Sequence, residues 1–381
     1  MKVVCAETVL LGQEAFSSLG ETRVLPDRSI SREDLLDADA LIVRSKTTVN
    51  ANLLEGTSVQ FVATATAGTD HLDISWLDEH DIAWASSPGC NANSVSEYLV
   101  AALLTLAVRH DFSLTEKTIG IIGCGEVGGR VARKCRSLGM RVLCNDPPRA
   151  AAGEEGFLPL DQVLAASDFV SLHVPLHRQG PWPTHRLADY RFFEQLKPGA
   201  IFINAARGGV CDYDALLDVQ NAGVISRIVL DVWDPEPAIR TDLIQIADIA
   251  TPHIAGHSLE GKLNGTLACF RECRHFFERP ENWDPSPHLP PPSTPFLEYL
   301  MEGERDEVVL HKLVAKVYDI QADDRILRKG LPLEEISRAL FFDQLRANYP
   351  IRREFSNTRI HLKNASDHLR WKLEGLGFLL D

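Results

Sequence analysis

Three residues whose side chains could together oxidise an alcohol each follow a short apolar run of the sequence. Arg207 follows AIFINAA, Glu236 follows RIVLDVWDP and His253 follows DIATP. A histidine titrates near neutral pH, which suits uptake of a hydroxyl proton as hydride leaves the neighbouring carbon. Glu236 can orient the imidazole and raise its basicity. The planar fork of Arg207 can hold a carboxylate in a bidentate contact.

Taken one at a time, these residues have ordinary interpretations. Arg207 could be a surface charge, Glu236 a loop residue, and His253 a hydrogen-bonded histidine at a strand end. Their shared position after candidate strands favours a joint role, because the carboxyl ends of parallel strands meet at one edge of a sheet. The set therefore predicts oxidation of a hydroxyl group next to a carboxylate.

A glycine-rich run indicates where the hydride would go. The spacing GxGxxG lies between the strand-like segment TIGIIG and the helix-like segment VGGRVARKCRSLG, which is typical of a loop that binds the pyrophosphate of a dinucleotide. Its glycines permit a tight turn, a close approach of the backbone to the pyrophosphate, and close helix–strand packing. The helix N-terminus adds N–H groups and partial positive charge. The cofactor-binding residues predicted in this loop are Gly123, Gly125, Glu126, Val127 and Gly128.

The charge at the end of the next strand distinguishes NAD from NADP. Asp146 ends the run RVLCND, 18 residues after Gly128. A carboxylate there can accept hydrogen bonds from the ribose hydroxyls of NAD and repels the 2′-phosphate of NADP. Arg149 lies three residues further on and could restore NADP binding. The balance favours NAD as the cofactor.

The elements that must position these residues alternate between strand and helix, which predicts an α/β fold. A long apolar helix, which Asn93 or Ser94 should cap, separates five candidate strands from six more. The first group includes short helices such as Ser31–Leu36 and Ile74–His80. We therefore expect two doubly wound parallel-sheet (Rossmann-like) domains. The candidate strands are Lys2–Ala6, Arg23–Leu25, Ala40–Val43, Phe61–Ala65, Ile82–Ala85, Thr118–Gly123, Arg141–Asp146, Phe169–His173, Ala200–Asn204, Arg227–Asp231 and Asp248–Thr251.

The order of these elements sets the expected domain boundaries. Residues 1–95 and 256–284 should form a substrate-binding (lid) domain, because the helical run after Ala255 returns to the first sheet. Residues 96–255 should form the NAD-binding Rossmann domain.

The last hundred residues have a different composition. Residues 285–295 lie in the run DPSPHLPPPSTP and predict an extended proline-rich linker. Residues 296–381 combine a helical run, LEEISRALFFDQLRANY, with the strand-like run Thr358–Leu362. They predict a separate C-terminal α+β dimerisation domain, and with it a homodimer.

Five runs resemble, in order and spacing, the D-isomer-specific 2-hydroxy-acid dehydrogenases. They are GCGEVGGRVA, LHVPL, LKPGAIFINAARGGV, LDVWDPEP and TPHIAG, and the resemblance covers roughly residues 1–280. It implies that Arg207, Glu236 and His253 are the catalytic set, and that the N-terminal runs LIVRSKT and TATAGTDHLD face the substrate. The further residues that it implies at the cofactor are Val174, Pro175, Ala205, Asp231 and Gly256.

Three other runs resemble a subgroup of this family that acts on a small phosphorylated 2-hydroxy acid. They are TATAGTDHLD, IAGHSLEGKLNGT and FFDQLRANYPIRREFS, the last in a C-terminal extension that other members usually lack. One departure is His257, which stands where the subgroup tends to have tyrosine and could replace a phenolic hydrogen bond. It could also be mistaken for the base, but His253 directly follows Thr251-Pro252 as in the family. The substrate-binding residues implied are Arg44, Ser45, Thr66 and His257.

A phosphorylated acid needs basic groups for its two anionic ends. Arg44, Ser45 and Lys46 follow the apolar run ALIV and can bind either anion, although a solvated turn is the ordinary alternative. Arginines of the C-terminal segment are further candidates, for which a charged, solvated surface is the simpler interpretation. They are Arg346, Arg352 and Arg353.

The composition excludes several classes of function. The formal net charge of −14 argues against nucleic-acid binding, which needs a basic surface. No run approaches the length of a membrane span, and the N-terminus indicates a strand rather than a signal peptide. Eight scattered cysteines without CxxC spacing indicate reduced thiols and no metal site. We therefore expect a cytoplasmic protein.

Two alternatives stay open at this point. The first is phosphoglycerate dehydrogenase, an enzyme of the same family that handles a smaller phosphorylated 2-hydroxy acid. The second is a non-catalytic, NAD(H)-sensing regulator on the same fold, because a fold does not fix a function and a regulator can retain the Arg–Glu–His set.

Overall fold

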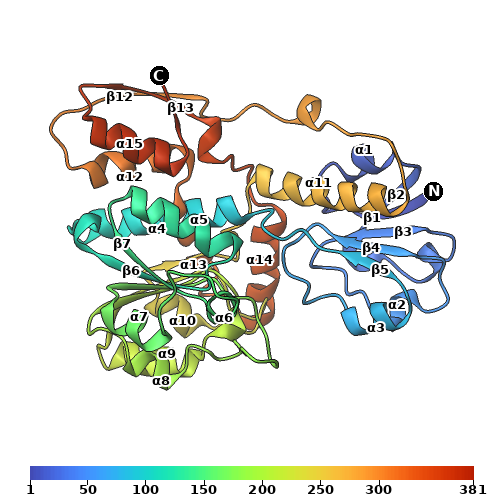
Figure 1. The fold of residues 1–381 in the computed structure, drawn as a ribbon, viewed down its shortest axis with the longest axis horizontal. Coiled ribbons are helices and arrows are strands. Elements are labelled where there is room, and N and C mark those ends of the chain that lie inside the picture. Colours follow the sequence, from blue (N-terminus) through green and yellow to red (C-terminus); the bar gives the residue numbers. More distant parts are fainter. The chain divides into compact units, whose positions relative to one another are not determined.

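The computed structural model describes residues 1–381 and divides them into two compact units (Figure 1). Unit 1 comprises residues 1–91 and 258–291, and unit 2 comprises residues 92–257 and 292–381. Each contains a parallel sheet with helices on both faces, which confirms the predicted α/β fold class. The chain crosses between the units within a few residues of the predicted points.

Unit 1 is built on a five-stranded parallel sheet in the order β2-β1-β3-β4-β5. The central strands are apolar and buried along their whole length, as expected where helices cover both faces. The predicted helix at Ser31–Leu36 is instead a short 3-10 turn at Glu33–Leu35. The elements are β1 (Lys2–Ala6), α1 (Gly12–Phe16), β2 (Glu21–Leu25), β3 (Ala40–Val43), α2 (Ala51–Leu54), β4 (Phe61–Thr64), α3 (Ile74–Glu79), β5 (Ala83–Ala85) and α11 (Leu259–Phe276).

Helix α11 confirms that the chain returns to the first sheet after Ala255. Its Gly265 packs so closely on the chain after β4 that an added Cβ would lie 2.6 Å from Ala65 O. Ser87 Oγ donates to Gly265 O (3.2 Å) and to Thr64 O (3.0 Å). A small residue is therefore required where this helix crosses the sheet.

Unit 2 is built on a six-stranded parallel sheet in the order β11-β10-β9-β8-β6-β7. The chain runs outward from β6 to β7 and then in the opposite direction from β8 to β11. In such sheets the loops beside the point of reversal form the ligand site. The strands lie within two residues of their predicted ends: β6 (Thr118–Ile122), β7 (Arg141–Asn145), β8 (Phe169–Leu172), β9 (Ala200–Asn204), β10 (Ile225–Leu230) and β11 (Ile249–Ala250).

Helices cover both faces of this second sheet. Figure 1 shows α4 and α5 on one face and α7, α9 and α10 on the other. The helices are α4 (Ala92–Arg109), α5 (Glu126–Ser137), α6 (Pro147–Ala151), α7 (Leu160–Ala166), α8 (Tyr190–Glu194), α9 (Tyr213–Asn221) and α10 (Thr241–Ile246).

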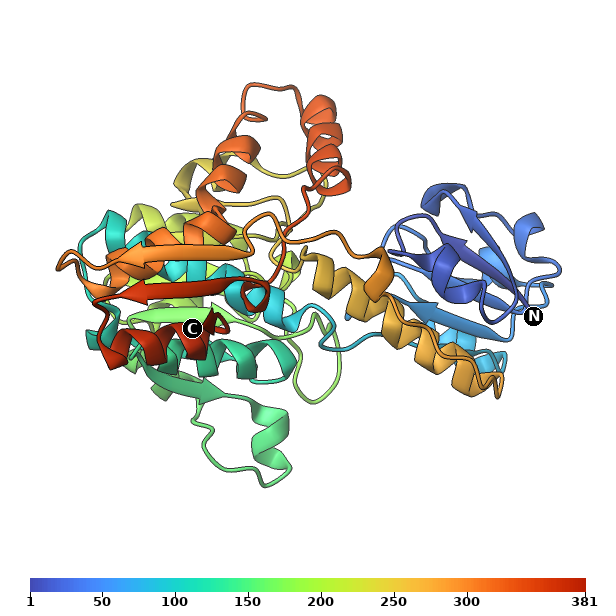
Figure 2. The ribbon, with the colours of Figure 1, turned by 90° about the horizontal axis from the view of Figure 1, so that it is seen from above.

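The C-terminal segment does not form the separate module that we predicted. Its helices α12 and α15 pack on α4 and α5 and share one continuous apolar core with them. Figure 2 shows its strands β12 and β13 side by side in a small parallel sheet. The elements are β12 (Phe296–Leu300), α12 (Asp306–Val317), α13 (Ile320–Arg328), α14 (Glu335–Ala347), β13 (Arg359–Lys363), α15 (Asp367–Leu376) and β14 (Leu379–Leu380).

The start of α4 also differs from the prediction, because the C-terminal segment packs against it. The helix begins at Ala92, so Asn93 and Ser94 lie inside its first turn and do not cap it. Their side chains donate instead to the Glu354 carboxylate, at 2.6 Å and 2.7 Å. A tertiary contact with the C-terminal segment thus occupies the groups that the sequence suggested for capping.

A buried ionic network joins α4, α5 and the C-terminal segment. Lys134 Nζ lies 3.7 Å from Glu97 Oε1, and both side chains are almost fully buried. Burial raises the pKa of Glu97 to about 8, although Lys134 opposes the shift. Arg352 donates to the carbonyls of Ser94 (2.9 Å) and Ala255 (2.8 Å). Arg352 is only 5% exposed, so the prediction that it lies on a solvated surface was wrong.

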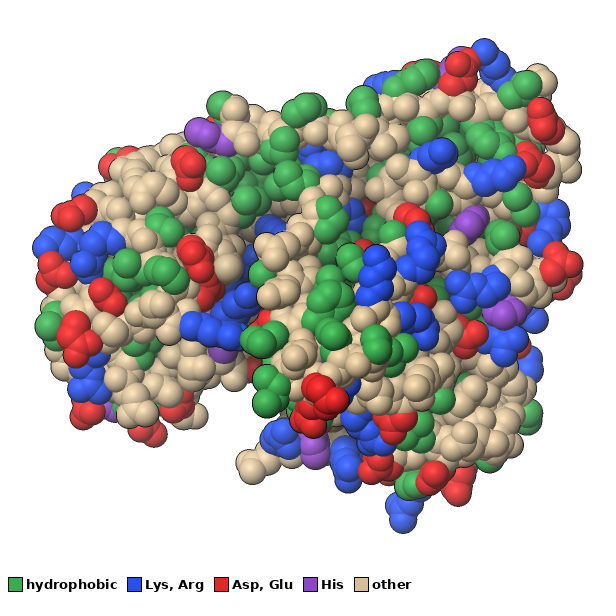
Figure 3. Space-filling model, turned by 180° about the vertical axis from the view of Figure 1, so that it is seen from behind, with side chains coloured by type: hydrophobic (Ala, Val, Ile, Leu, Met, Phe, Trp, Pro, Cys, Tyr) green, Lys and Arg blue, Asp and Glu red, His purple; other side chains and the backbone are tan.

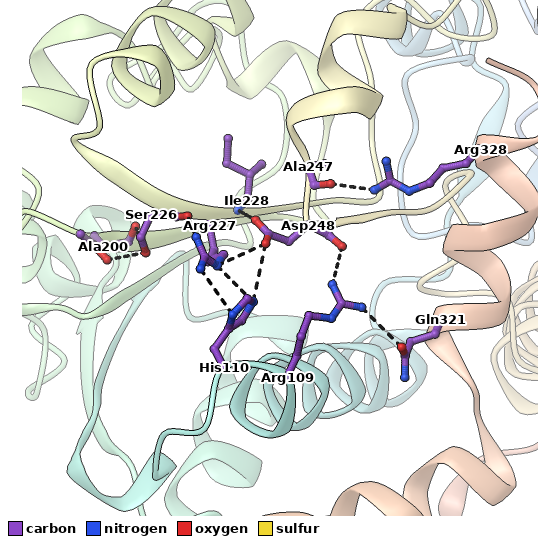
Figure 4. A network of polar contacts seen from close by, with 11 residues as sticks. Arg109, His110, Ala200, Ser226, Arg227, Ile228, Ala247, Asp248, Gln321 and Arg328 are labelled. Atoms are coloured by element: carbon purple, nitrogen blue, oxygen red, sulfur yellow. Dashed lines mark hydrogen bonds and ion pairs between the residues drawn. The ribbon is translucent and has the colours of Figure 1, made fainter. Parts of the chain in front are cut away.

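Helix α13 lies next to β11, an edge strand of the six-stranded sheet (Figure 4). Arg328 donates to the carbonyls of Ile244 and Ala247, both at 2.7 Å, and pairs with Asp324. Asp324 accepts a hydrogen bond from Ala250 N (2.8 Å). Arg328 therefore satisfies carbonyls that no strand or helix partner reaches.

We predict that Arg328→Ala lowers the free energy of unfolding by about 1–3 kcal/mol, because it removes several charge-assisted hydrogen bonds from partly buried carbonyls. Urea denaturation followed by circular dichroism measures the change. The matched control is Arg325→Ala on the same helix, where the arginine is 62% exposed and pairs only with Asp319. Equal stability of the two variants would contradict this assignment.

Candidate active site

Glu236 and His253 form a hydrogen-bonded pair at the carboxyl edge of the second sheet. Glu236 follows β10 and His253 follows β11, and these strands are neighbours. Both carboxylate oxygens of Glu236 lie near His253 Nδ1, at 2.8 Å and 3.0 Å. A neutral imidazole that donates from Nδ1 carries its lone pair on Nε2, so the pair presents a base at that atom.

The electrostatic setting keeps Glu236 ionised. Burial would raise the pKa of this carboxyl, but the adjacent His253 and, further away, Arg346 outweigh burial and hold the pKa below its usual range. Glu236 Oε1 also accepts a hydrogen bond from Trp233 N (3.0 Å). The carboxylate is thus fixed by the backbone of its own loop before it meets the imidazole.

Asp231 fixes the loop that carries the histidine. Its Oδ1 accepts from Ile254 N (2.9 Å) and from Thr251 Oγ1 (2.6 Å), and its Oδ2 accepts from Ala255 N (2.9 Å). It is 1% exposed, and burial raises the pKa of its carboxyl above the usual value. The structure therefore shows Asp231 as a buried clasp of this loop, and the cofactor contact that the family resemblance implies stays a prediction.

The backbone of His253 is strained by this clasp. Its φ is +54°, a left-handed conformation that non-glycine residues adopt rarely and mostly where the surroundings force it. Trp233 Nε1 donates to Thr251 O (3.0 Å), and Tyr98 Oη lies 2.8 Å from Thr251 Oγ1. These contacts hold Thr251 at the start of the turn, and Asp231 holds Ile254 and Ala255 at its end, with the imidazole next to Glu236.

Arg207 follows the next strand of the sheet, β9, so all three predicted catalytic residues lie at one edge. Its Nη1 donates to Ala206 O (2.8 Å), and its carbonyl accepts from Asn204 Nδ2 (3.1 Å). An added Cβ on Gly208 would lie 1.9 Å from Trp233 O. The Arg207 loop therefore packs directly on the loop that leads to Glu236.

The glycine-rich loop has the geometry that its spacing predicts. Gly123 has φ +86°, and an added Cβ would lie 2.7 Å from Val174 Cγ1. An added Cβ on Gly128 would lie 1.9 Å from Gly123 O, so this glycine lets α5 pack on the loop. Gly125, at the N-terminus of α5, has no atom within 4 Å of an added Cβ. The loop thus presents bare backbone to open space where a dinucleotide phosphate would bind.

Asp146 is tied to the same loop. Its Oδ2 accepts from Cys124 N (2.8 Å), and its Oδ1 caps α6 by accepting from Arg149 N (3.2 Å). Arg149 pairs with Glu154 and stacks on Phe157. Its charge is therefore already balanced next to the position where NADP would need a free cation.

The remaining cofactor candidates lie in loops at the same edge. Val174 and Pro175 follow β8, Ala205 follows β9, and Gly256 lies in the His253 loop. His173 also lies here, although its place in the sequence did not indicate a site residue: it precedes Val174, and its Nε2 lies 2.9 Å from Ser171 Oγ. Burial lowers its pKa to about 3, so this imidazole is neutral.

The anion candidates of unit 1 follow two adjacent strands. Arg44 and Ser45 follow β3, and Thr66 lies two residues after β4, so they share one edge of the five-stranded sheet. Arg44 Nη1 donates to Thr8 O (3.2 Å), and Thr66 Oγ1 donates to Gly68 O (2.8 Å). Ser45 is exposed and Lys46 is half-buried.

His257 is distinguished from His253 by its partners. Its ring packs edge-on against Tyr349, with centroids 5.7 Å apart, whereas the Glu236 carboxylate meets His253. The geometry therefore supports His253 over His257 as the base. Arg346, predicted only as a phosphate candidate or a surface charge, lies 3.9 Å from Glu236.

Comparison with protein families agrees with this arrangement. Residues 105–255 match the family described as D-isomer specific 2-hydroxyacid dehydrogenase, NAD binding domain. Residues 289–377 match a second family, described only as a domain of unknown function.

Solved structures share the fold of most of the chain. A formate dehydrogenase from Staphylococcus aureus in complex with NAD has a TM-score of 0.62 at 24% identity, covering 74% of this chain and 98% of that chain. A D-lactate dehydrogenase from Aquifex aeolicus with NAD and lactic acid has a TM-score of 0.61 at 25% identity, covering 72% and 95%.

Relatives of similar length show the family more narrowly. An erythronate-4-phosphate dehydrogenase of Cronobacter sakazakii is 44% identical over 99% of this chain and 98% of its own length. One from Salmonella schwarzengrund is 46% identical over 94% of this chain and 93% of its own length. The similarity thus extends through the catalytic loops and the C-terminal segment, and the chain belongs to the erythronate-4-phosphate dehydrogenase family, a branch of the D-isomer-specific 2-hydroxy-acid dehydrogenases.

Proposed function

We propose that the protein oxidises 4-phospho-D-erythronate to 2-oxo-3-hydroxy-4-phosphobutanoate with NAD, in the biosynthesis of pyridoxal 5′-phosphate (vitamin B6). The observation that carries the proposal is the Glu236–His253 pair, whose Nε2 side is left for a substrate at the edge of an NAD-binding fold. Near-full-length similarity to erythronate-4-phosphate dehydrogenases supports the choice of substrate.

Different residues of the chain transfer the proton and bind the anionic groups of the substrate. His253 takes the proton of the substrate hydroxyl at Nε2, while the Glu236 carboxylate stabilises the positive charge that this creates on the imidazole. Arg207 binds the substrate carboxylate and polarises the carbonyl oxygen as it forms. Arg44, Ser45, Thr66 and His257 bind the other polar groups of the substrate.

The glycine-rich loop and Asp146 fit NAD. Bound NAD supplies the acceptor for the hydride that leaves the substrate. The bare backbone at Gly125 and the N-terminus of α5 suit its pyrophosphate, and the Asp146 carboxylate suits the ribose hydroxyls. Because Arg149 is already paired with Glu154, we infer a preference for NAD over NADP.

The two alternatives fit less well. A phosphoglycerate dehydrogenase does not account for near-full-length similarity to erythronate-4-phosphate dehydrogenases, including the C-terminal segment. A regulator that only senses NAD(H) has no need of the Glu236–His253 pair, in which a strained backbone holds the imidazole against the carboxylate.

The surface fits a protein that acts on small molecules. On the face drawn in Figure 3, basic side chains are interspersed with acidic ones. No helix has the length and apolar character needed to cross a membrane. All eight cysteines are free, and seven are buried, which suits the cytoplasm that we propose as its location.

We predict that the protein reduces NAD when mixed with 4-phospho-D-erythronate, with a kcat/KM at least tenfold higher than with 3-phosphoglycerate or with NADP as the cofactor. Absorbance of the reduced nicotinamide at 340 nm measures both comparisons. Faster turnover of 3-phosphoglycerate would indicate that the protein is a phosphoglycerate dehydrogenase. Binding of NAD without turnover of any 2-hydroxy acid would assign the regulator.

We predict that His253→Asn lowers kcat by about 10²–10⁴-fold, because a positioned base typically contributes that much. NAD affinity, measured by fluorescence titration, should stay within about twofold, because the glycine-rich loop is unchanged. His257→Ala is the comparison: because His257 is proposed to bind the substrate, its loss should raise KM but lower kcat far less than His253→Asn does. Loss of turnover in His257→Ala but not in His253→Asn would show that the base is the other histidine.

We also propose that the protein is a homodimer joined through residues 296–381. Most of its exposed large hydrophobic side chains lie in this segment, and such side chains mark protein contacts when they gather. They occur on the outer face of the small sheet, on α14 and on the loops and helices beside them: Phe296, Leu300, Ile326, Leu333, Ile336, Leu340, Ile351, Trp371 and Leu379.

Truncation at the linker is not a clean test of this dimer, because residues such as Val309, Leu313 and Phe355 fill the core of unit 2. We predict instead that charged substitutions on one of two exposed faces yield monomers in light scattering. One variant is Ile336→Lys with Leu340→Lys on α14, and the other is Phe296→Lys with Leu300→Lys on β12. Leu36→Lys, at a leucine of unit 1 that is 53% exposed, should leave the mass unchanged. If both double variants stay dimeric, the interface lies elsewhere.

A further inference from the structure

The Glu236 carboxylate has a second cationic neighbour besides His253. Arg346 Nη1 lies 3.9 Å from Glu236 Oε2, the same oxygen that lies 2.8 Å from His253 Nδ1. The side chains of Arg346 and Glu236 are 19% and 20% exposed, so solvent screens this pair only in part. The same carboxylate oxygen therefore lies near both the imidazole and the guanidinium.

Arg346 is held in this position by apolar packing. Its guanidinium lies over the ring of Phe342, one turn earlier on α14, at 5.8 Å from the centroid. Phe342 is fully buried in the same apolar core as Ile239, which follows Glu236 by three residues. Arg346 Nε is buried and has no hydrogen-bond partner. Glu236 is the carboxylate that the structure gives this arginine as an ion-pair partner.

Helix α14 is attached to the loop that carries Glu236 by a second arginine. Arg338 Nε donates to Ile239 O (3.3 Å), and its Nη1 donates to Leu333 O at the start of the helix. Arg338 therefore fixes the helix to the loop, and Arg346, two turns later, reaches the carboxylate. A distance of 3.9 Å is too long for a hydrogen bond, so Arg346 acts on Glu236 as a charge.

We propose that Arg346 is a positioning residue of the active site, whose charge lowers the pH at which the Glu236–His253 pair takes up a proton. The C-terminal extension thereby tunes the base of the active site. The proposal deepens the proposed function, and only its kinetic test depends on that function.

Other charged and titratable groups near the pair do not substitute for Arg346. Tyr213 on α9 faces Glu236, and burial raises its pKa far above neutral pH, so it stays uncharged. Asp234 lies in the same loop as Glu236, and Asp231 faces His253 from its clasp. Both of these are acids, which favour a proton on the pair. Arg207, at the same edge of the sheet, is a cation assigned to the substrate carboxylate. Arg346 is the arginine that forms an ion pair with Glu236 and opposes the two acids.

Removal of this cation should move the pH dependence of both directions of the reaction to higher pH. Oxidation of the hydroxy acid needs the pair without its extra proton, whereas reduction of the 2-oxo acid needs it protonated. In Arg346→Gln the pair should keep its proton to a pH higher by roughly one unit, the scale of one partly screened charge a few ångströms away. At any one pH the ratio of the two kcat/KM values stays tied to the equilibrium constant, so the limbs of the two pH profiles, rather than the rates at a single pH, report the change. A merely structural defect would lower both rates and leave the limbs in place.

The first experiment needs neither substrate nor cofactor. The full-length protein is labelled at its histidine rings and titrated by NMR, with His253→Asn identifying the His253 signal. Arg346→Gln should move the His253 midpoint upward by roughly one pH unit, and Arg346→Lys should restore at least half of the difference. The control is Arg325→Gln on α13, an exposed arginine that pairs with Asp319, which should leave the midpoint within about 0.2 units.

The second experiment measures kcat/KM against pH in both directions for the same variants. The acidic limb of oxidation and the basic limb of reduction should both move upward in Arg346→Gln. An unchanged His253 midpoint, or a rise in KM alone with both limbs in place, would overturn the proposal and make Arg346 a substrate-binding residue. Absence of turnover in the unmodified protein would instead refute the proposed function, and the NMR titration would still decide the role of Arg346.

Discussion

The active site depends on the clasp that Asp231 forms around the turn after β11. One buried carboxylate binds two backbone N–H groups and a threonine hydroxyl, and this fixes the chain in a reversal that leaves His253 in a left-handed conformation. The energy of that strained residue, of order 1–3 kcal/mol, is offset by the hydrogen bonds of the clasp. In return the imidazole is hydrogen-bonded to Glu236, so the base is organised before a substrate arrives.

The C-terminal segment belongs to the same physical unit as this turn. Arg352 binds the carbonyl of Ala255 inside the loop, Tyr349 packs on His257, and Arg346 faces Glu236. Tyr318 and Tyr349 both donate to Asp323, whose pKa burial raises to about 6. The segment thus supports the catalytic loop from behind, whereas in shorter members of the wider family some other part of the chain must do so.

Much of this architecture could be predicted from the sequence. Short apolar runs bounded by glycine, proline and aspartate predicted the strands of the two larger sheets to within two residues, because a parallel strand buried on both faces needs apolar residues throughout. The strands β12 and β14 of the small sheet were not predicted. The spacing of Gly123, Gly125 and Gly128 predicted a geometry that an added Cβ would break at two of the three positions. The order of strands and polar residues also placed Arg207, Glu236 and His253 at one edge.

Tertiary contacts account for what the sequence did not predict. Asn93 and Ser94 are good capping residues, but their side chains bind Glu354, some 260 positions away. The proline-rich run suggested a detached module, although the helix at Ala92–Arg109 is apolar on nearly all sides and so needs a cover beyond its own sheet. Nothing in the spacing of Arg346 or Arg352 indicates that one faces a carboxylate and the other is buried.

The contact between Ser94 and Glu354 also constrains how the chain can be made. During synthesis α4 leaves the ribosome long before α12 and the Phe355 turn that complete its surroundings. For the time needed to translate some 250 further residues, the outer side of this helix has no native partner. Unit 1 can complete its fold earlier, as soon as α11 has been synthesised. The nascent chain therefore carries an exposed apolar helix for tens of seconds at ordinary translation rates, and it is in this interval that the protein is most prone to aggregate and most dependent on chaperones.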